Sequence, residues 1–140
     1  SASPEALRPS LGAHVYGCDV CQDVCPYNRP APVSTDPHWQ PRPALDLPSL
    51  AELWSRPDRE WRRAIEGTPM TRAKVAGLRR NVAVALGAVG DRAGASVLDA
   101  GGEDRASVAT PRVQQHVAWA RERLGSDPPA GRAGPDPEQR

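Results

Sequence analysis

The chain has 140 residues, a formal net charge of +1, and a composition that is 39% hydrophobic and 25% charged. This length accommodates one modest domain with extensions. Such a balanced charge predicts neither a general nucleic-acid binder nor an acidic surface, so any such function must rest on local clusters. No stretch has the apolar length of a membrane span, and we therefore expect no membrane partner.

The first predicted element, residues 1–28, contains the only three cysteines of the chain, Cys18, Cys21 and Cys25. Their spacing is C-x2-C-x3-C with Pro26 directly after, which is the second half of the bacterial ferredoxin run C-x2-C-x2-C-x3-C-P. In two-cluster ferredoxins the last cysteine of that run binds the other cluster. We therefore expect Cys18 and Cys21 to bind one 4Fe–4S cluster and Cys25 a second one, in the second half of a ferredoxin-like domain.

This ligand set is incomplete, because each of two cubane clusters needs four ligands. Val15 occupies the position of the run's first cysteine, so the remaining five cysteines must lie outside this chain. The chain also begins at Ser1 without an initiator methionine, and Met70 is its only methionine. We therefore expect the C-terminal part of a larger iron–sulfur protein, in the cytoplasm, where thiols stay reduced.

Two other uses of the cysteines stay open. A Cys3His zinc site could use His14 as its fourth ligand, because zinc accepts mixed thiolate and imidazole sets. The x3 gap and the following proline favour iron–sulfur over zinc. A disulfide pair with one free thiol fits poorly with an odd number of cysteines in so short a cluster.

The remaining predicted elements follow in chain order. Residues 29–46 contain five prolines, which cannot sustain a helix or a central strand, so they should form an extended connector. Residues 47–125 have apolar side chains at helical spacing and should form a helical region. Residues 126–140 have almost nothing apolar to bury, and we expect them to be disordered.

Helix starts and stops can be read within the helical region. Pro48 suits a first helical position, and a second short helix should follow Pro57 and end at Gly67. Thr68–Pro69 gives a cap followed by proline, which marks the start of the strongest helix. That helix should have a single apolar stripe, formed by Val75, Leu78, Val82, Ala85, Leu86 and Val89. Gly87 and Gly90 should stop it.

Two more helices complete the prediction. A short helix should cover residues 91–100, and Thr110–Pro111 should begin a last helix that Gly125 closes. Short amphipathic helices separated by glycine-containing breaks suggest stacked pairs of the HEAT type, with an ordinary small helical bundle as the alternative. The predicted fold class is therefore mainly α, with a partial ferredoxin-like 4Fe–4S segment followed by a small HEAT-like helical repeat region. The stripe of the last helix is Val113, Val117, Ala120 and Leu124.

Three blocks of this sequence, at residues 11–28, 67–74 and 78–87, closely resemble the C-terminal part of the epoxyqueuosine reductase family, in the same order and at matching separations. The resemblance covers roughly residues 3–125, and the cysteine block is its most specific part. It implies a cytoplasmic enzyme that uses cobalamin and two 4Fe–4S clusters to reduce epoxyqueuosine to queuosine in the tRNA anticodon loop.

The resemblance also implies what this chain lacks. In that family the cobalamin domain, the acidic residue proposed as proton donor and the other five cysteines lie upstream of the matched region. We therefore expect no catalytic residue in this chain and an upstream catalytic domain of the same protein as its partner. The full-length protein is expected to be a monomer, and this part alone should be inactive.

A basic cluster on the strongest predicted helix is the candidate tRNA-binding surface. On an ideal helix Arg72 and Arg79 lie within about 20° of each other, and Arg80 lies about 80° from Arg72. With Lys74 on the opposite flank, these residues could hold the phosphates of the anticodon stem-loop without reading its bases. The alternative is a solvated helix face.

Two further functions compete with the reductase. One is an iron–sulfur electron-transfer subunit whose partner chain supplies the missing cysteines. The other is a zinc-stabilised helical adaptor without a redox role. Spectra of the metal-loaded protein separate both iron–sulfur hypotheses from zinc.

Overall fold

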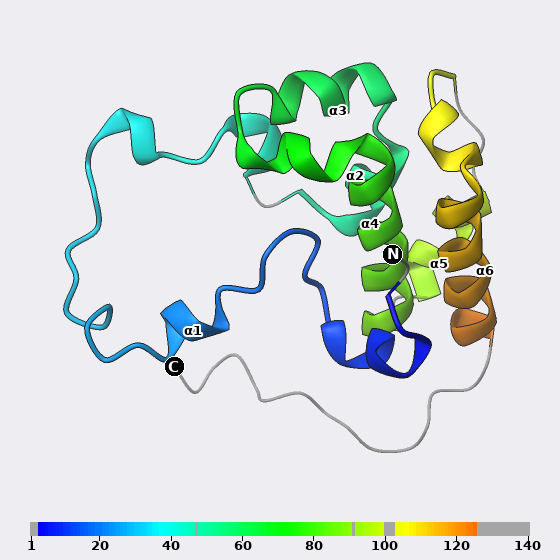
Figure 1. The fold of residues 1–140 in the computed structure, drawn as a ribbon, viewed down its shortest axis with the longest axis horizontal. Coiled ribbons are helices and arrows are strands. Elements are labelled where there is room, and N and C mark those ends of the chain that lie inside the picture. Colours follow the sequence, from blue (N-terminus) through cyan, green and yellow to red (C-terminus); the bar gives the residue numbers. More distant parts are fainter. Residues whose placement is uncertain (1–2, 47, 91, 100–102, 126–140) are drawn as a thin grey trace.

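The computed structural model describes residues 3–46, 48–90, 92–99 and 103–125, and the predicted disordered tail lies outside these residues. The described residues form helices and no strands, which confirms the mainly α prediction (Figure 1). Short 3-10 helices alternate with α-helices along the chain. The α-helices are α1 (Val20–Asp23), α2 (Leu50–Ser55), α3 (Asp58–Ile65), α4 (Lys74–Val89), α5 (Arg92–Asp99) and α6 (Pro111–Gly125). The 3-10 helices are η1 (Glu5–Leu11), η2 (Pro37–Trp39), η3 (Pro43–Leu45), η4 (Pro69–Ala73) and η5 (Ala106–Ala109).

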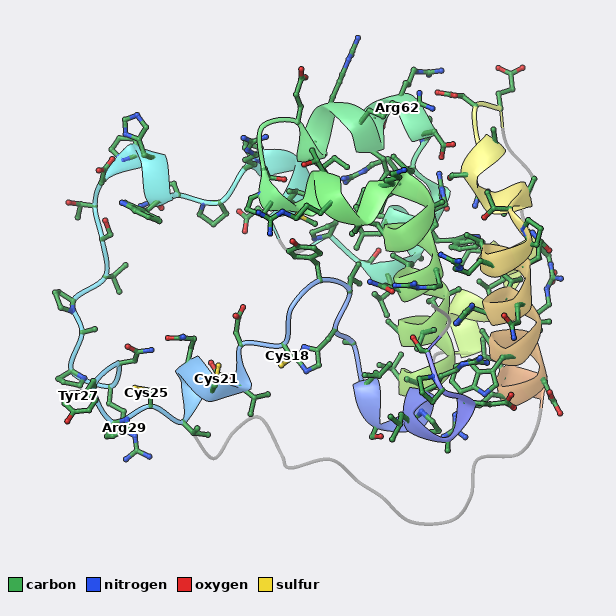
Figure 2. The ribbon with its side chains drawn as sticks, viewed as in Figure 1. Cys18, Cys21, Cys25, Tyr27, Arg29 and Arg62 are labelled. Carbon is green, nitrogen blue, oxygen red and sulfur yellow. The ribbon has the colours of Figure 1, made fainter. Side chains whose placement is uncertain are left out.

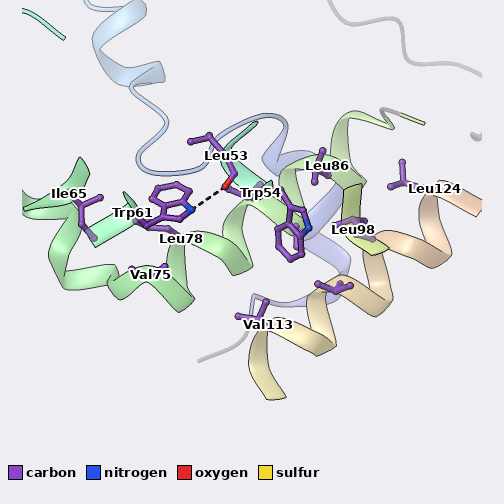
Figure 3. Packing of buried hydrophobic residues seen from close by; sticks show 14 residues of the cluster. Leu53, Trp54, Trp61, Ile65, Val75, Leu78, Leu86, Leu98, Val113 and Leu124 are labelled. Atoms are coloured by element: carbon purple, nitrogen blue, oxygen red, sulfur yellow. Dashed lines mark hydrogen bonds between the residues drawn. The ribbon is translucent and has the colours of Figure 1, made fainter. Parts of the chain in front are cut away.

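Helix α4 forms the centre of the core and packs most extensively against α6 (Figures 1 and 3). The predicted apolar stripe of α4 is buried except at Val89, the last residue of the helix, which is 46% exposed. The predicted stripe of α6 is buried throughout. Each fully buried Leu or Val side chain contributes about 1.5–3 kcal/mol to the free energy of unfolding relative to an exposed one. The contact between α4 and α6 therefore stabilises the fold. None of the described helices is long and apolar enough to cross a membrane.

Helix α2 begins at Leu50, two residues later than the sequence suggested, because Ser49 and not Pro48 directs its start. The hydroxyl of Ser49 accepts from the backbone N–H of Glu52 at 3.1 Å, and the Glu52 carboxylate accepts from the Ser49 N–H at 2.7 Å. This reciprocal pair is a capping box. Helix α3 then folds back on α2, where the indole N–H of Trp61 donates to the carbonyl of Leu53 at 3.1 Å (Figure 3).

The strongest predicted helix is divided in two. Thr68 caps η4 through its hydroxyl, as the sequence predicted, but the backbone of Lys74 has a φ of 57° and α4 starts anew there. Gly87 does not stop α4, which continues to Val89 and ends before Gly90. A Cβ atom on Gly87 would lie 2.7 Å from the Trp119 ring, so this glycine permits the close approach of α4 and α6.

The N-terminal segment is docked on the helical region. Helix η1 packs against α4, and the guanidinium of Arg8 lies 5.5 Å from the ring centroid of Trp119 on α6. Arg8 is only 3% exposed and donates to the carbonyl of Ser3. The anchored start of the chain therefore fixes the position from which the cysteine-containing segment leaves.

That segment, residues 16–41, extends away from the helices and is called the cysteine arm below (Figure 1). Its residues are exposed apart from Cys25, which is half-buried. The arm returns at Arg42, whose guanidinium donates to the carbonyls of Glu66 at 2.6 Å and Ala64 at 3.2 Å, at the end of α3. Both ends of the arm are therefore attached to the helical unit.

Candidate metal-binding arm and basic groove

The three cysteines lie around the single-turn helix α1. Asp19 has a left-handed backbone (φ 47°), which turns the chain after Cys18 into the helix that contains Cys21. Cys25 follows the helix, and its N–H donates to the carbonyl of Gln22 at 3.2 Å. Figure 2 shows the three side chains spaced along the arm.

A side-chain hydrogen bond closes the turn after Cys25. The Asn28 amide donates to the side-chain oxygen of Gln22 at 2.7 Å and to its carbonyl at 3.2 Å. The N–H of Asn28 also donates to the carbonyl of Cys25 at 3.1 Å. These bonds close a loop from Gln22 to Asn28 that contains Cys25.

The chemistry of the three thiols fits iron–sulfur ligation. All three are free, with Cys18 and Cys21 exposed and Cys25 half-buried. Within the described residues, no three His, Cys, Asp or Glu side chains are grouped closely enough to hold a metal ion. A cluster with four ligands therefore needs further thiolates beside these, and Cys18, Cys21 and Cys25 remain the predicted ligands from this chain.

Cys18 borders two hollows where the arm leaves the helical unit. One, of about 540 Å³, lies against Asn81 and Val84 of α4. The other, of about 530 Å³, has Trp61 and Leu53 in its wall. His14, the alternative zinc ligand, lines both hollows together with Cys18. An apolar wall beside Cys18 would shield a bound metal group from water on one side.

A basic groove of about 780 Å³ lies between the first turns of α4 and α6. Three of the predicted tRNA-binding residues line it, namely Arg72, Lys74 and Arg80. Arg112 from the first turn of α6 lines it as well. The groove therefore gathers four cationic side chains, from η4 and α4 on one side and from α6, which is far away in the sequence, on the other.

The electrostatics of this groove favour an anion. Burial lowers the pKa of Arg80 from its ordinary value, and the nearby charge of Arg112 lowers it further. Neither α4 nor α6 has an acidic residue in its first turn. Both helices instead place a cation there, Lys74 and Arg112, where the helix dipole is already positive. A phosphate in the groove would relieve this crowding of positive charge.

Arg79 does not belong to this surface, which corrects the prediction from helix angles. Its side chain is 0% exposed. It donates to Asp58 at 3.2 Å, to the Ser107 hydroxyl at 3.1 Å, and to the carbonyls of Trp54 and Arg56. Arg79 is therefore a core residue that joins α4 to α2, α3 and η5, and it is not available to a phosphate.

Sequence reasoning missed Arg112 and the role of Asn81. A signal for Arg112 was present, because Thr110–Pro111 places Arg112 in a first turn, where a cation is unfavourable without an anionic partner. Asn81 donates to the carbonyl of Val15 at 2.7 Å, a contact between residues 66 positions apart. No local pattern in the sequence indicates such a pair.

These features define a small helical protein with an exposed thiol-containing arm and a basic groove. The chain is similar to the epoxyqueuosine reductase of Alicycliphilus denitrificans, with 40% identity over 121 residues, and to that of Escherichia coli, with 36% over 120 residues. The first alignment covers 84% of this chain and 34% of the relative, and the second covers 85% and 30%. With the enzyme of Synechococcus sp. it shares 45% identity over 83 residues, which cover 59% of this chain and 26% of the relative.

The chain thus spans about a third of the length of the curated relatives it matches. Over that part it is a homologue of the epoxyqueuosine reductases, as the sequence motifs predicted. No protein-family model matches the chain, and no solved structure matches it significantly.

Proposed function

We propose that this chain is the C-terminal part of an epoxyqueuosine reductase. It contributes cysteine ligands to two 4Fe–4S clusters and a binding surface for the tRNA anticodon stem-loop. The parent enzyme reduces epoxyqueuosine to queuosine in tRNA, in the cytoplasm, and binds cobalamin mainly through its upstream catalytic domain. The single observation that carries this proposal is the similarity to curated epoxyqueuosine reductases over 84–85% of the chain.

The cysteine arm supports the metal part of the proposal. Cys18 and Cys21 bind one cluster and Cys25 the other, while the remaining ligands come from the upstream part of the enzyme. When bound, such clusters supply single electrons at potentials set by their surroundings. The residues of this chain hold the thiols in place: Asp19 turns the backbone after Cys18, and Asn28 closes the turn after Cys25.

The basic groove supports the RNA part of the proposal. Four cations and two helix N-termini match the regular negative charge of a phosphate backbone. Contacts of this kind position an RNA stem and contribute to affinity whatever its sequence. The groove is built mostly by helices α4 and α6, so the surface is rigid before RNA arrives.

An RNA titration tests the groove. The triple variant Arg72→Gln, Arg80→Gln, Arg112→Gln should weaken binding of an anticodon stem-loop RNA, measured by fluorescence anisotropy at several salt concentrations. Each lost phosphate contact should reduce the slope of log K against log salt by about 0.7 to 0.9. The charge-matched control is Arg59→Gln, Arg62→Gln, Arg63→Gln on the exposed face of α3. Equal losses in both triple variants would show only a general effect of net charge.

Anaerobic reconstitution tests the metal part. Visible absorption and EPR spectra of the chain with iron and sulfide should show weak, substoichiometric binding. A stable four-iron cluster in the monomer would contradict the division of ligands between two clusters. Tight zinc binding that is lost in His14→Ala would instead favour the zinc-stabilised adaptor.

A further inference from the structure

Asn81 uses both ends of its side-chain amide to connect two parts of the molecule. Its Nδ2 donates to the carbonyl of Val15 at 2.7 Å. Its Oδ1 accepts from Arg80 twice, from Nε at 3.0 Å and from Nη2 at 2.8 Å. Asn81 is therefore a bridge between a backbone carbonyl of the N-terminal segment and a cationic side chain of α4.

The two partners of Asn81 belong to the two candidate sites. Arg80 lines the basic groove together with Arg112. Val15 lies three positions before Cys18 and lines both hollows beside that cysteine. The side chain of Asn81 thus connects a residue of the basic groove with the residue that precedes the cysteine arm.

The bridge is specific in its chemistry. Asparagine is a weaker helix former than Ala or Leu, so its presence inside α4 is not explained by helix propensity. Val15 contributes its backbone carbonyl to the bridge, and an aliphatic side chain at position 81 could not donate a hydrogen bond to it. The guanidinium of Arg80 is planar, and its two N–H groups bound to one oxygen restrict its orientation in the groove.

We propose that Asn81 is a positioning residue that holds the beginning of the cysteine arm, through Val15, against α4. We further propose that Asn81 makes this part of the arm more ordered when a phosphate occupies the basic groove. The second half rests on the proposed RNA-binding function. A phosphate that orders Arg80 also orders Asn81, because Nε and Nη2 of Arg80 both donate to the same Asn81 oxygen. The Asn81 amide then holds the Val15 carbonyl more firmly, and Cys18 occupies a narrower range of positions.

Hydrogen exchange of the metal-free chain tests the first half. Asn81→Ala should accelerate amide exchange in residues 11–18 by about fivefold, as expected for the loss of one hydrogen bond. Exchange in α6 should not change. Asn81→Asp keeps an acceptor for Arg80 but loses the donor to Val15, so it should release the same segment. The matched control is Gln114→Ala, because Gln114 also donates from a helix to a backbone carbonyl, that of Val108 at 2.9 Å.

The same measurement with anticodon stem-loop RNA tests the second half. RNA should slow exchange in residues 11–18 of the wild-type chain, and this slowing should disappear in Asn81→Ala when both chains are measured at a saturating RNA concentration. Unchanged exchange of residues 11–18 in Asn81→Ala without RNA would overturn the positioning role. Slowing by RNA that persists in Asn81→Ala would overturn the link. A wild-type chain that binds no RNA would overturn the proposed function and the link with it, while the RNA-free comparison still decides the positioning role.

Discussion

Arg79 and Asp58 form an ion pair inside the protein, with Nη2 of Arg79 3.2 Å from Oδ1 of Asp58 and side-chain exposures of 0% and 1%. Ser107 completes the arrangement, since its hydroxyl and its N–H donate to Asp58 at 2.6 and 2.8 Å. Burial alone would raise the pKa of Asp58, but the hydrogen bonds from Ser107 and the charge of Arg79 outweigh it and lower the pKa below its ordinary value of 3.8.

Neutralising this pair on one side should be strongly destabilising. Asp58→Asn leaves the charge of Arg79 buried without compensation, which costs about 3–5 kcal/mol. The matched control is Asp99→Asn, because Asp99 pairs with Arg121 at 2.5 Å on the surface. Such an exposed pair contributes about 0–1 kcal/mol. Urea unfolding followed by circular dichroism measures both, and equal losses would contradict the structural role of the buried pair.

Two glycines of α4 should respond in opposite directions to alanine. Gly87→Ala would place a methyl group 2.7 Å from the Trp119 ring and 3.0 Å from the Ala120 backbone, so overpacking should destabilise the fold by about 1–3 kcal/mol. Gly77→Ala meets only ordinary contact, 3.5 Å from the Ala73 side chain, and should stabilise it by up to about 1 kcal/mol. Thermal unfolding of the two variants checks the difference in sign.

His116 should make the free energy of unfolding decrease as the pH falls below neutrality. It is 0% exposed, and its Nδ1–H donates to the Arg112 carbonyl at 2.7 Å. Burial lowers the pKa of His116 below its ordinary 6.5, and the charges of Arg8, Arg80 and Arg112 lower it further.

Between its lowered folded pKa and 6.5, the unfolded state therefore binds a proton that the folded state does not, and the free energy of unfolding falls as the pH falls. Urea unfolding at pH values from 7.5 down to about 5 measures this slope. His116→Leu should reduce it, although the variant loses some stability at every pH. His38→Gln, at a side chain that is 92% exposed, is the control for substituting a histidine outside the core. A slope that is the same in His116→Leu and the wild type would assign the pH dependence to other groups.

The helical unit should fold without metal. Cys18, Cys21 and Cys25 lie on the exposed arm and take no part in the buried cluster. Replacing all three with Ser should change the free energy of unfolding of the metal-free chain by no more than about 0.5 kcal/mol. Leu78→Ala, from the centre of the core, should cost about 2–5 kcal/mol by comparison. Loss of helical circular dichroism in the triple Ser variant would contradict this independence.

The apolar stripes of the two longest helices were predictable from local patterns, while the elements that pack on the other faces of α4 were not. The stripes of α4 and α6 follow directly from the spacing of Val and Leu, and they are buried as expected except at Val89. Arg79 was misplaced because a single stripe was assumed for α4. In the structure η1, α2 and α6 all pack on this helix, and residues 82–86 are buried without interruption.

The basic groove was predicted only in part for the same reason. Helix geometry predicted a basic flank with Arg72 and Arg80 but placed Lys74 on the opposite flank. The predicted helix is divided at Lys74, and all three residues line the groove. Arg112 joins them only because the first turn of α6 lies beside the first turn of α4. A single sequence gives no direct signal for which distant segments pack together, and the hydrogen bond from Asn81 to Val15 depends on such packing.

The attachment of both ends of the cysteine arm has a consequence for how the protein could change over time. The arm departs beside the hydrogen bond from Asn81 to Val15 and returns at Arg42, whose guanidinium is held by the end of α3. Between fixed ends, each doubling of a flexible loop costs only about 0.6 kcal/mol in closure entropy. Insertions and deletions within residues 16–41 are therefore compatible with an unchanged helical core. The arm can be lengthened, shortened or given a different metal-binding sequence while the helical core keeps its structure.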